Sequence, residues 1–249
     1  MTSVGEHTML PIAALILADA TGRKFAGMDL NERAALVASD AGIHHCYFKG
    51  SRLPDFAGMT RLRERGAFTL GILGGPRLFA SVPNAEVIVV IDACTIADAD
   101  LLRAAVRKSM VEGRATLLVD PGPHRKDSLI QVNDGRVTSV MGDGNATNCG
   151  VLVLPQSLVA RVRTVHSLRD AVHRLAKADL LAAVPTGDRF CRVLDDRGGV
   201  AAIEREYARS HRQLVLRAIS ARIGGLFETV IAGQRAVPAA SGTGRPSPA

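Results

Sequence analysis

Apolar runs alternate with helical patterns through the first half of the chain. Residues 10–18 (LPIAALILA) and 86–91 (EVIVVI) are apolar or β-branched almost throughout, which is typical of strands buried on both faces. Residues 30–41 place their apolar side chains on one helical stripe, and residues 98–112 predict a second helix. Strands that alternate with helices predict right-handed crossovers and a mostly parallel sheet.

The second half of the chain mixes hairpin and helical signals. Asn133-Asp134-Gly135 has the composition of a hairpin turn between strands predicted at residues 129–132 and 136–140. Further strands are predicted at residues 43–48, 68–73, 116–119, 151–154 and 189–194, and further helices at residues 59–65, 166–176 and 200–232.

Together these elements predict an α/β fold, a three-layer α/β/α sandwich with a mostly parallel (mixed) sheet in which one late strand runs antiparallel. Such a sandwich buries both faces of its central strands. The residues that we expect to be buried in them are Leu15, Leu17, Val87, Val89, Ile91, Leu117, Val151 and Val153.

The pattern also predicts the organisation of the chain. Residues 1–9 form a flexible N-terminus, residues 10–210 one folded domain, residues 211–233 a basic amphipathic helix and residues 234–249 a disordered tail. The tail is rich in Pro, Gly, Ser and Ala, which cannot bury enough apolar surface to fold.

The amphipathic helix at residues 211–233 needs a partner for its apolar stripe. It can pack on its own domain, pair with a second copy in a homodimer, or lie in an anionic membrane interface. Its apolar residues recur at steps of three and four, namely Leu214, Val215, Ala218, Ile219, Ile223, Leu226, Phe227, Val230 and Ile231.

Composition narrows the range of partners. The chain is 47% hydrophobic and carries a formal charge of +7, so it can build a core and attract phosphorylated molecules. It has no Trp and shows no nucleic-acid-binding module, so a nucleic-acid partner is not expected. The four cysteines form no C-x-x-C pair, and no apolar run is long enough to span a membrane. We expect a cytoplasmic protein, with peripheral membrane contact as the alternative.

Candidate binding residues gather at one edge of the predicted sheet. Ligands of parallel sheets bind at the carboxyl ends of the strands, which is where residues 19–27 and Asp92 fall. Backbone N–H groups of such a loop can hold phosphates, and Arg23 and Lys24 can balance their charge. The loop matches neither the Walker P-loop nor G-x-G-x-x-G.

The loop resembles the opening of the GT-A-like sugar-phosphate nucleotidyltransferases, which has a Leu-Ala-Ala-Gly-x-Gly-x-Arg-like sequence. The matching residues here are Leu17, Ala18, Gly22 and Lys24. Asp19 and Ala20 replace a small residue and the first glycine. Residues 31–43, 134–137, 148–154 and 189–206 are similar to later segments of the family, so the likeness spans roughly residues 10–210. It is closest in character to the inositol-phosphate cytidylyltransferases.

The resemblance implies a transfer of a nucleotidyl group, CMP from CTP in the closest group, to a phosphorylated sugar or polyol, with release of pyrophosphate. It implies that Lys24 and Asp92 are catalytic and that Asp92 and Asp195 bind Mg²⁺. It also implies that the loop holds the nucleotide, through Leu17, Ala18, Asp19, Gly22, Arg23 and Lys24.

Several positions depart from the family pattern. The spacing puts Cys94 where the family has its first metal-binding aspartate, and Gly142 where it has a lysine. We expect Cys94 to be a half-buried thiol, not a nucleophile. These departures leave a second hypothesis, a catalytically inactive relative with a binding or regulatory role in lipid or polysaccharide synthesis.

Overall fold

The computed structural model describes residues 10–50, 59, 62, 69–79, 81–82, 84–122, 128–140, 144–194 and 200–210. The chain divides into two compact units, Met1–Glu204 and Arg205–Ala249, and the first unit contains all the described strands. In chain order its elements are β1 (Leu10–Leu17), β2 (Lys24–Phe25), β3 (Met28–Asp29), α1 (Leu30–Asp40), β4 (His45–Lys49), β5 (Thr69–Ile72), β6 (Ala85–Asp92), β7 (Thr95–Ala97), α3 (Ala99–Glu112), β8 (Ala115–Pro121), β9 (Leu129–Asn133), β10 (Arg136–Ser139), β11 (Ala146–Pro155), α4 (Gln156–Val162), α5 (Leu168–Lys177), β12 (Leu181–Pro185) and β13 (Cys191–Val193). Residues 200–210 are also helical.

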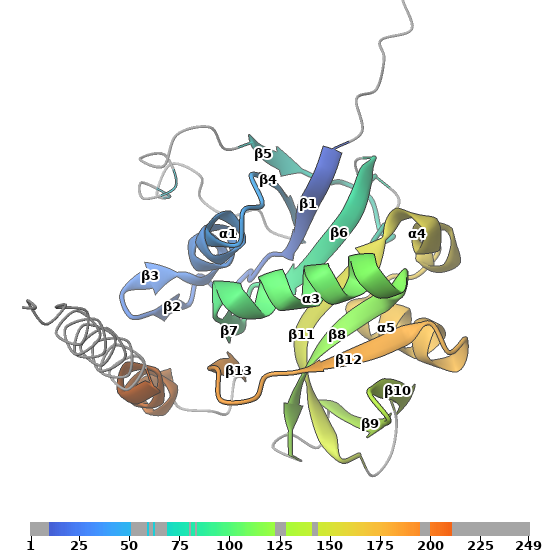
Figure 1. Cartoon of the computed structure of the whole chain (residues 1–249). Helices are drawn as coiled ribbons and strands as arrows, with labels where there is room; N and C mark the ends of the chain where they lie inside the picture. The colour runs from blue at the N-terminus through green and yellow to red at the C-terminus, as the bar shows by residue number, and fades with distance from the viewer. Residues whose placement is uncertain are drawn as a thin grey trace, which may run out of the picture. The chain divides into compact units, whose positions relative to one another are not determined.

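One mixed sheet runs through the first unit, in the order β5-β4-β1-β6-β11-β8-β12-β10-β9 (Figure 1). The pairs β5–β4, β4–β1, β1–β6 and β8–β12 are parallel. Strand β11 is antiparallel to both of its long neighbours, β6 and β8, which confirms the predicted antiparallel late strand. A second strand also reverses direction, because β10 pairs antiparallel with β12 and with β9 across the predicted hairpin.

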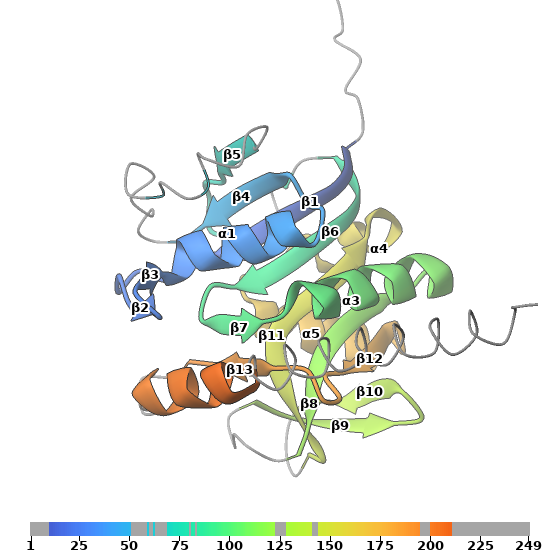
Figure 2. The ribbon, with the colours of Figure 1, turned by 60° about the vertical axis from the view of Figure 1, so that its left-hand side comes forward.

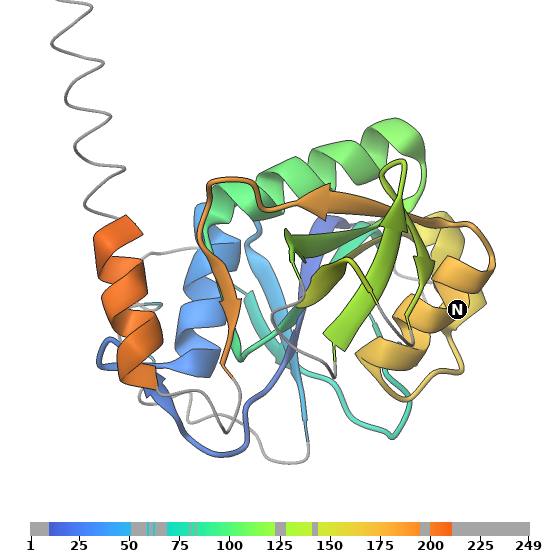
Figure 3. The ribbon, with the colours of Figure 1, turned by 90° about the horizontal axis from the view of Figure 1, so that it is seen from below.

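The two faces of the sheet can be assigned from side chains that share a register. Val89, Val153 and Thr116 are neighbours across β6, β11 and β8, and the Thr116 hydroxyl donates to the Ala105 carbonyl of α3. The next residues along, Val90 and Leu152, face the other way and belong to the cluster that includes residues of α4 and α5. Helices α1 and α3 therefore cover one face and α4 and α5 the other, which confirms the three-layer sandwich (Figure 3).

Seven of the eight side chains that we expected to be buried are at most 3% exposed. Leu17 differs, because it is the last residue of β1 and packs only partly against the core at the sheet edge. Burial therefore follows the alternation of side chains along the central strands, and it is incomplete at a strand end that borders a cavity.

Five of the described elements were not predicted, namely the strands β2, β3, β7 and β12 and the helix α4. β12 (LAAVP) lacks the β-branched run that marks a buried strand, and α4 buries only Val162. The strand predicted at residues 189–194 exists as β13, but it pairs with β7 in a separate two-stranded sheet instead of the main sheet (Figure 2). Most of the helix predicted at residues 59–65 lies outside the described residues.

The predicted segments at the two ends of the chain, residues 1–9, 211–233 and 234–249, also lie outside the described residues. Within the part of the chain that the structure describes, no helix is long and apolar enough to cross a membrane.

The burial of Leu152 in the central sheet predicts a large loss of stability when its side chain is truncated. Its side chain is fully buried, so Leu152→Ala should lower the free energy of unfolding by about 2–5 kcal/mol through lost burial and the cavity left behind. Val111→Ala is the control, because Val111 is 80% exposed on α3 and its truncation should change stability by less than about 0.5 kcal/mol. Urea denaturation of both variants measures the difference; equal midpoints would contradict the assigned core.

Candidate functional site

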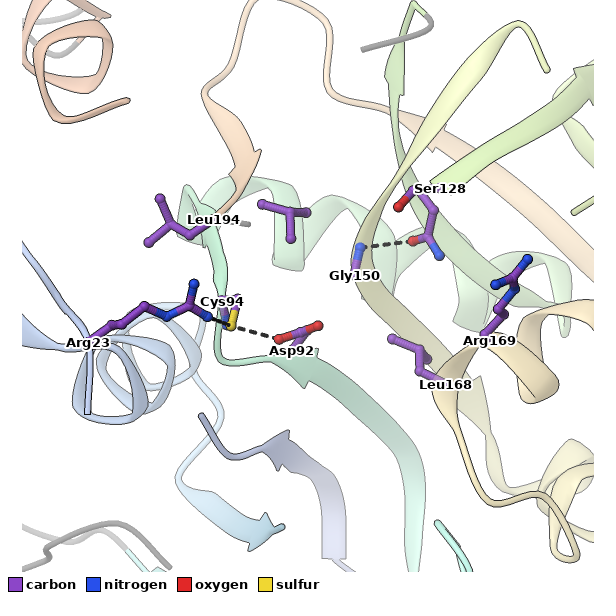
Figure 4. A pocket seen from close by; sticks show the side chains of 10 residues that line it. Arg23, Asp92, Cys94, Ser128, Gly150, Leu168, Arg169 and Leu194 are labelled. Carbon is purple, nitrogen blue, oxygen red and sulfur yellow. Dashed lines mark hydrogen bonds between the residues drawn. The ribbon is translucent and has the colours of Figure 1, made fainter. Parts of the chain in front are cut away.

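A cavity of about 340 Å³ opens where β1 and β6 end. Figure 4 shows Arg23 and Arg169 on opposite sides of this cavity, with Asp92 between them. Its lining residues are Arg23, Asp92, Cys94, Ser128, Asn148, Gly150, Leu168, Arg169, Val193 and Leu194. They come from both halves of the unit, so the cavity forms only when the sheet is complete.

The carboxylate of Asp92 is fixed at the end of the central strand. Asp92 is the last residue of β6 and lies opposite Leu17, the last residue of β1. The Ala93 N–H donates to the Leu17 carbonyl over 3.0 Å, and the Cys94 N–H donates to Asp92 Oδ1 over 2.9 Å. The turn after β6 therefore holds the side chain at the edge of the sheet, where ligands of α/β proteins bind.

Strand β11 passes so close to Asp92 that only glycine fits at position 150. A Cβ on Gly150 would lie 2.5 Å from Thr95 Oγ1 and 3.1 Å from the Asp92 Cβ, and its backbone φ is +75°. The Thr95 hydroxyl is itself fixed, because it donates to the Cys149 carbonyl over 2.8 Å. The absence of a side chain lets the two strands of the site approach each other.

The loop after β1 brings Arg23 to the cavity. The Arg23 guanidinium lies 2.8 Å from the Cys94 sulfur and 3.3 Å from Asp19 Oδ1. Asn31, in the first turn of α1, holds the backbone of Asp19 from both sides: its Oδ1 accepts from the Asp19 N–H and its Nδ2 donates to the Asp19 carbonyl. The loop is thus tied to α1 as well as to the turn after β6.

Asp19 is the most enclosed charged group in this loop. Burial alone would raise the pKa of its carboxyl, but hydrogen bonds from Thr21 and Arg23 and the Arg23 charge together hold the pKa below its ordinary value. The carboxylate is therefore charged at neutral pH and satisfied within the loop.

Cys94 is a neutral thiol. Burial raises the pKa of this thiol and the neighbouring Asp92 carboxylate raises it further, to about 12. A thiolate is the nucleophilic form of cysteine, so this environment suits a structural thiol.

The structure brings together some of the predicted site residues and leaves others apart. Arg23 and Asp92 line the cavity, whereas Leu17 and Ala18 lie half-buried before the loop, and Gly22 and Lys24 are exposed and do not line it. Asp195 and Gly142 lie outside the described residues. Leu194, which precedes Asp195 in sequence, lines the cavity and donates its N–H to the Cys94 carbonyl over 2.8 Å.

Sequence reasoning missed Ser128, Asn148, Gly150 and Arg169 as cavity residues. Asn148 and Gly150 stand in the stretch that resembles a family strand, but nothing in the sequence shows that this strand passes over Asp92. Arg169 lies in the first turn of α5 and, among the described residues, makes no ion pair. Its only sequence signal is a cation near a helix N-terminus, where an acidic residue is the usual choice.

A second cavity of about 430 Å³ lies beside the first and shares Leu168 with it. Its lining residues are Leu17, Lys49, Gly50, Gly75, Pro76, Leu78, His166, Ser167 and Leu168. Lys49 Nζ donates to the carbonyls of Gly74 and Gly75, and burial lowers the pKa of Lys49. A ligand could therefore extend along the sheet edge from one cavity to the other.

Across the described part of the chain, no group of three or more His, Cys, Asp or Glu side chains could hold a metal ion. Asp92 does lie next to the segment that leads to Asp195, through the bond from Leu194 to Cys94. Among the described residues Asp92 is the one carboxylate that lines this cavity, so a hard cation bound here would need further oxygen ligands from water or phosphate.

Because Gly150 lies so close to Thr95 and Asp92, Gly150→Ala should destabilise the fold more than an alanine at another glycine with positive φ. Steric overlap with Thr95 adds to the positive φ, so we expect a loss of about 3 kcal/mol of stability. Gly187→Ala is the matched control, because Gly187 also has a positive φ (+58°) but nothing within 4 Å, and it should cost about 1 kcal/mol. Thermal unfolding compares the two, and equal losses would show that β11 does not crowd Asp92.

The raised pKa of Cys94 predicts slow alkylation. At pH 8 an ordinary thiol is partly ionised, whereas Cys94 stays protonated until the pH approaches about 12, so iodoacetamide should label it slowly. Asp92→Asn removes a negative charge that disfavours the thiolate, which should lower this pKa and speed labelling, while Asp100→Asn should not. Mass spectrometry of the labelled peptide follows the rate; fast labelling of the wild-type chain at pH 8 would contradict this environment.

Comparison with known proteins identifies the fold. No family model and no curated protein matches the sequence. The chain is similar to a UDP-glucose pyrophosphorylase from Acinetobacter baumannii (14% identity, TM-score 0.62, 84% of this chain and 100% of that one). It is also similar to a UDP-glucose pyrophosphorylase complexed with UDP-glucose (11%, TM-score 0.60, 81% and 99%) and to a UTP-bound UGPase from Acinetobacter baumannii (13%, TM-score 0.62, 84% and 99%). The chain therefore has a nucleotide-diphospho-sugar transferase-like α/β fold.

Proposed function

We propose that the chain is a nucleotidyltransferase that moves a nucleotidyl group from a nucleoside triphosphate to a phosphorylated sugar or polyol and releases pyrophosphate. The observation that carries the proposal is the cavity at the ends of β1 and β6, which is lined both by Arg23 from a phosphate-type loop and by the carboxylate of Asp92. Solved structures of the same fold that hold UTP or UDP-glucose support it. The resemblance to inositol-phosphate cytidylyltransferases favours CTP as the donor and CMP as the transferred group.

The chemistry needs positioning more than proton transfer. An oxygen of the acceptor phosphate forms a bond to the α-phosphorus, the bond from that phosphorus to the bridging oxygen breaks, and pyrophosphate leaves. The attacking oxygen is already ionised at neutral pH, so no strong base is required. Catalysis then comes from alignment and from neutralising the charge of the phosphates.

Charged side chains on opposite sides of the cavity match the two substrates. Arg23 holds the phosphates of the nucleotide beside Asp92, and the exposed Lys24 on β2 adds a second positive charge nearby. Arg169, on the other side of Asp92, receives the phosphate of the acceptor. The second cavity, which continues past Leu168 along the edge of the sheet, accommodates the nucleobase.

Asp92 and Asp195 are the residues that would hold Mg²⁺. When bound, Mg²⁺ supplies charge neutralisation and alignment of the phosphate oxygens. The role of the chain is to fix Asp92 through the Cys94 N–H and to leave room for the phosphates by the absence of a side chain at Gly150.

A second candidate function is supported by a specific observation. The donors of the loop already hold the Asp19 carboxylate, and a thiol stands where the family has its first metal-binding aspartate. A chain built in this way could bind a nucleotide or a partner without turnover, as a regulator of lipid or polysaccharide synthesis. Residues 211–233 would then provide contact with a second copy or with a membrane surface from the cytoplasm.

The proposal predicts release of pyrophosphate when CTP, a sugar or polyol phosphate and Mg²⁺ are supplied together. Arg169→Gln should raise the KM of the acceptor phosphate by about tenfold, since a charge-assisted contact is lost, and leave the KM of CTP unchanged. Arg163→Gln is the control, because Arg163 is exposed at the end of α4 and lines neither cavity. A coupled pyrophosphate assay measures both constants.

The assay should include a panel of nucleotides and of sugar and polyol phosphates. Silence across the whole panel with folded protein would contradict turnover and favour the regulatory function. If Arg169→Gln raised the KM of CTP as much as the KM of the acceptor, Arg169 would not bind the acceptor phosphate specifically.

A further inference from the structure

The loop between β1 and β2 contains a carboxylate, that of Asp19, which its own donors bind. The Asp19 side chain is only 4% exposed. Its oxygens accept from the Thr21 hydroxyl over 2.6 and 2.9 Å, from the Arg23 N–H over 3.2 Å and from the Arg23 guanidinium over 3.3 Å. A hydroxyl, a backbone N–H and a guanidinium therefore all converge on one carboxylate.

These are the kinds of donor that bind phosphate oxygens at loops of this type. A carboxylate and a phosphate use the same donors in the same way, so one such group excludes the other. The backbone of Asp19 is held by Asn31 through bonds of 2.8 and 3.1 Å, which keeps the carboxylate within the loop.

Arg23 is the residue that connects this carboxylate with the cavity. Its guanidinium contacts both Asp19 Oδ1 and the Cys94 sulfur, and the Cys94 N–H in turn holds Asp92. A phosphate that enters beside Asp92 must therefore compete with Asp19 for the same guanidinium.

We propose that Asp19 is an internal competitor that occupies the phosphate-binding donors of the loop until a polyphosphate displaces it. This inference rests on the proposed function, because the displacing ligand is the triphosphate of the nucleotide. A single phosphate offers too little charge to replace a carboxylate that is already attached to the loop, whereas a triphosphate contacts Arg23 and the edge of the cavity at once. Asp19 thereby makes the loop select polyphosphates over single phosphates.

The test is the binding of inorganic tripolyphosphate and of orthophosphate, measured by calorimetry with the full chain. Asp19→Asn removes the charge and keeps the size of the side chain, so tripolyphosphate should bind on the order of tenfold more tightly, and binding of orthophosphate should become detectable. Asp100→Asn is the matched control, because Asp100 is an exposed partner of Arg103 on α3 and its loss changes the net charge equally. Asp19→Ser serves as a second variant, and circular dichroism verifies the fold of each.

The proposal would be overturned if Asp19→Asn and Asp19→Ser bound tripolyphosphate no more tightly than Asp100→Asn does. Asp19 would then have only a structural role, in which it orients Arg23. Absence of binding by every protein would overturn the proposal as well. Failure of the proposed function gives a different result, in which CTP binds and the Asp19 variants bind it more tightly, yet no pyrophosphate is released.

Discussion

The insertion of the antiparallel strand β11 between β6 and β8 is the constraint on which the candidate site depends. It joins the parallel strands of the first half to the later strands, and it carries Gly150 across the Asp92 carboxylate. A side chain at position 150 would push the strands apart at the point where the cavity forms. The site is therefore a consequence of how two halves of one sheet meet, since its lining residues come from both halves.

A second consequence concerns charge. The loop after β1 and the turn after β6 approach each other through one arginine, which contacts Asp19 on one side and Cys94 on the other. The same arginine lines, together with Asp92, the cavity that would receive phosphates. The same few donors could therefore bind a phosphate ligand, stabilise charge during catalysis, or hold the protein's own Asp19 carboxylate. This sharing explains why the enzymatic and regulatory functions both fit the arrangement.

The fold was largely predictable because burial on both faces leaves a strong pattern, as in residues 86–91 of β6. β12 was missed because its alanines carry no such signal, and the pairing of β13 with β7 could not be predicted because it joins segments that are distant in the sequence. Within the site, Asp92 and Arg23 could be found from their places after strands. Gly150 and Arg169 could not, because their importance arises only from the approach of β11 and α5 to Asp92, which periodicity does not encode.

The most direct test of this account is whether a nucleotide binds at Asp92 together with magnesium. Calorimetric titration of CTP, UTP, ATP and GTP into the full chain, with Mg²⁺ and then with EDTA, measures this in the wild-type chain and in Asp92→Asn. The account predicts binding of at least one nucleotide that requires Mg²⁺ and is lost in Asp92→Asn, because this carboxylate lies at the centre of the cavity. Binding that is equally strong in EDTA, or that is unchanged in Asp92→Asn, would contradict it.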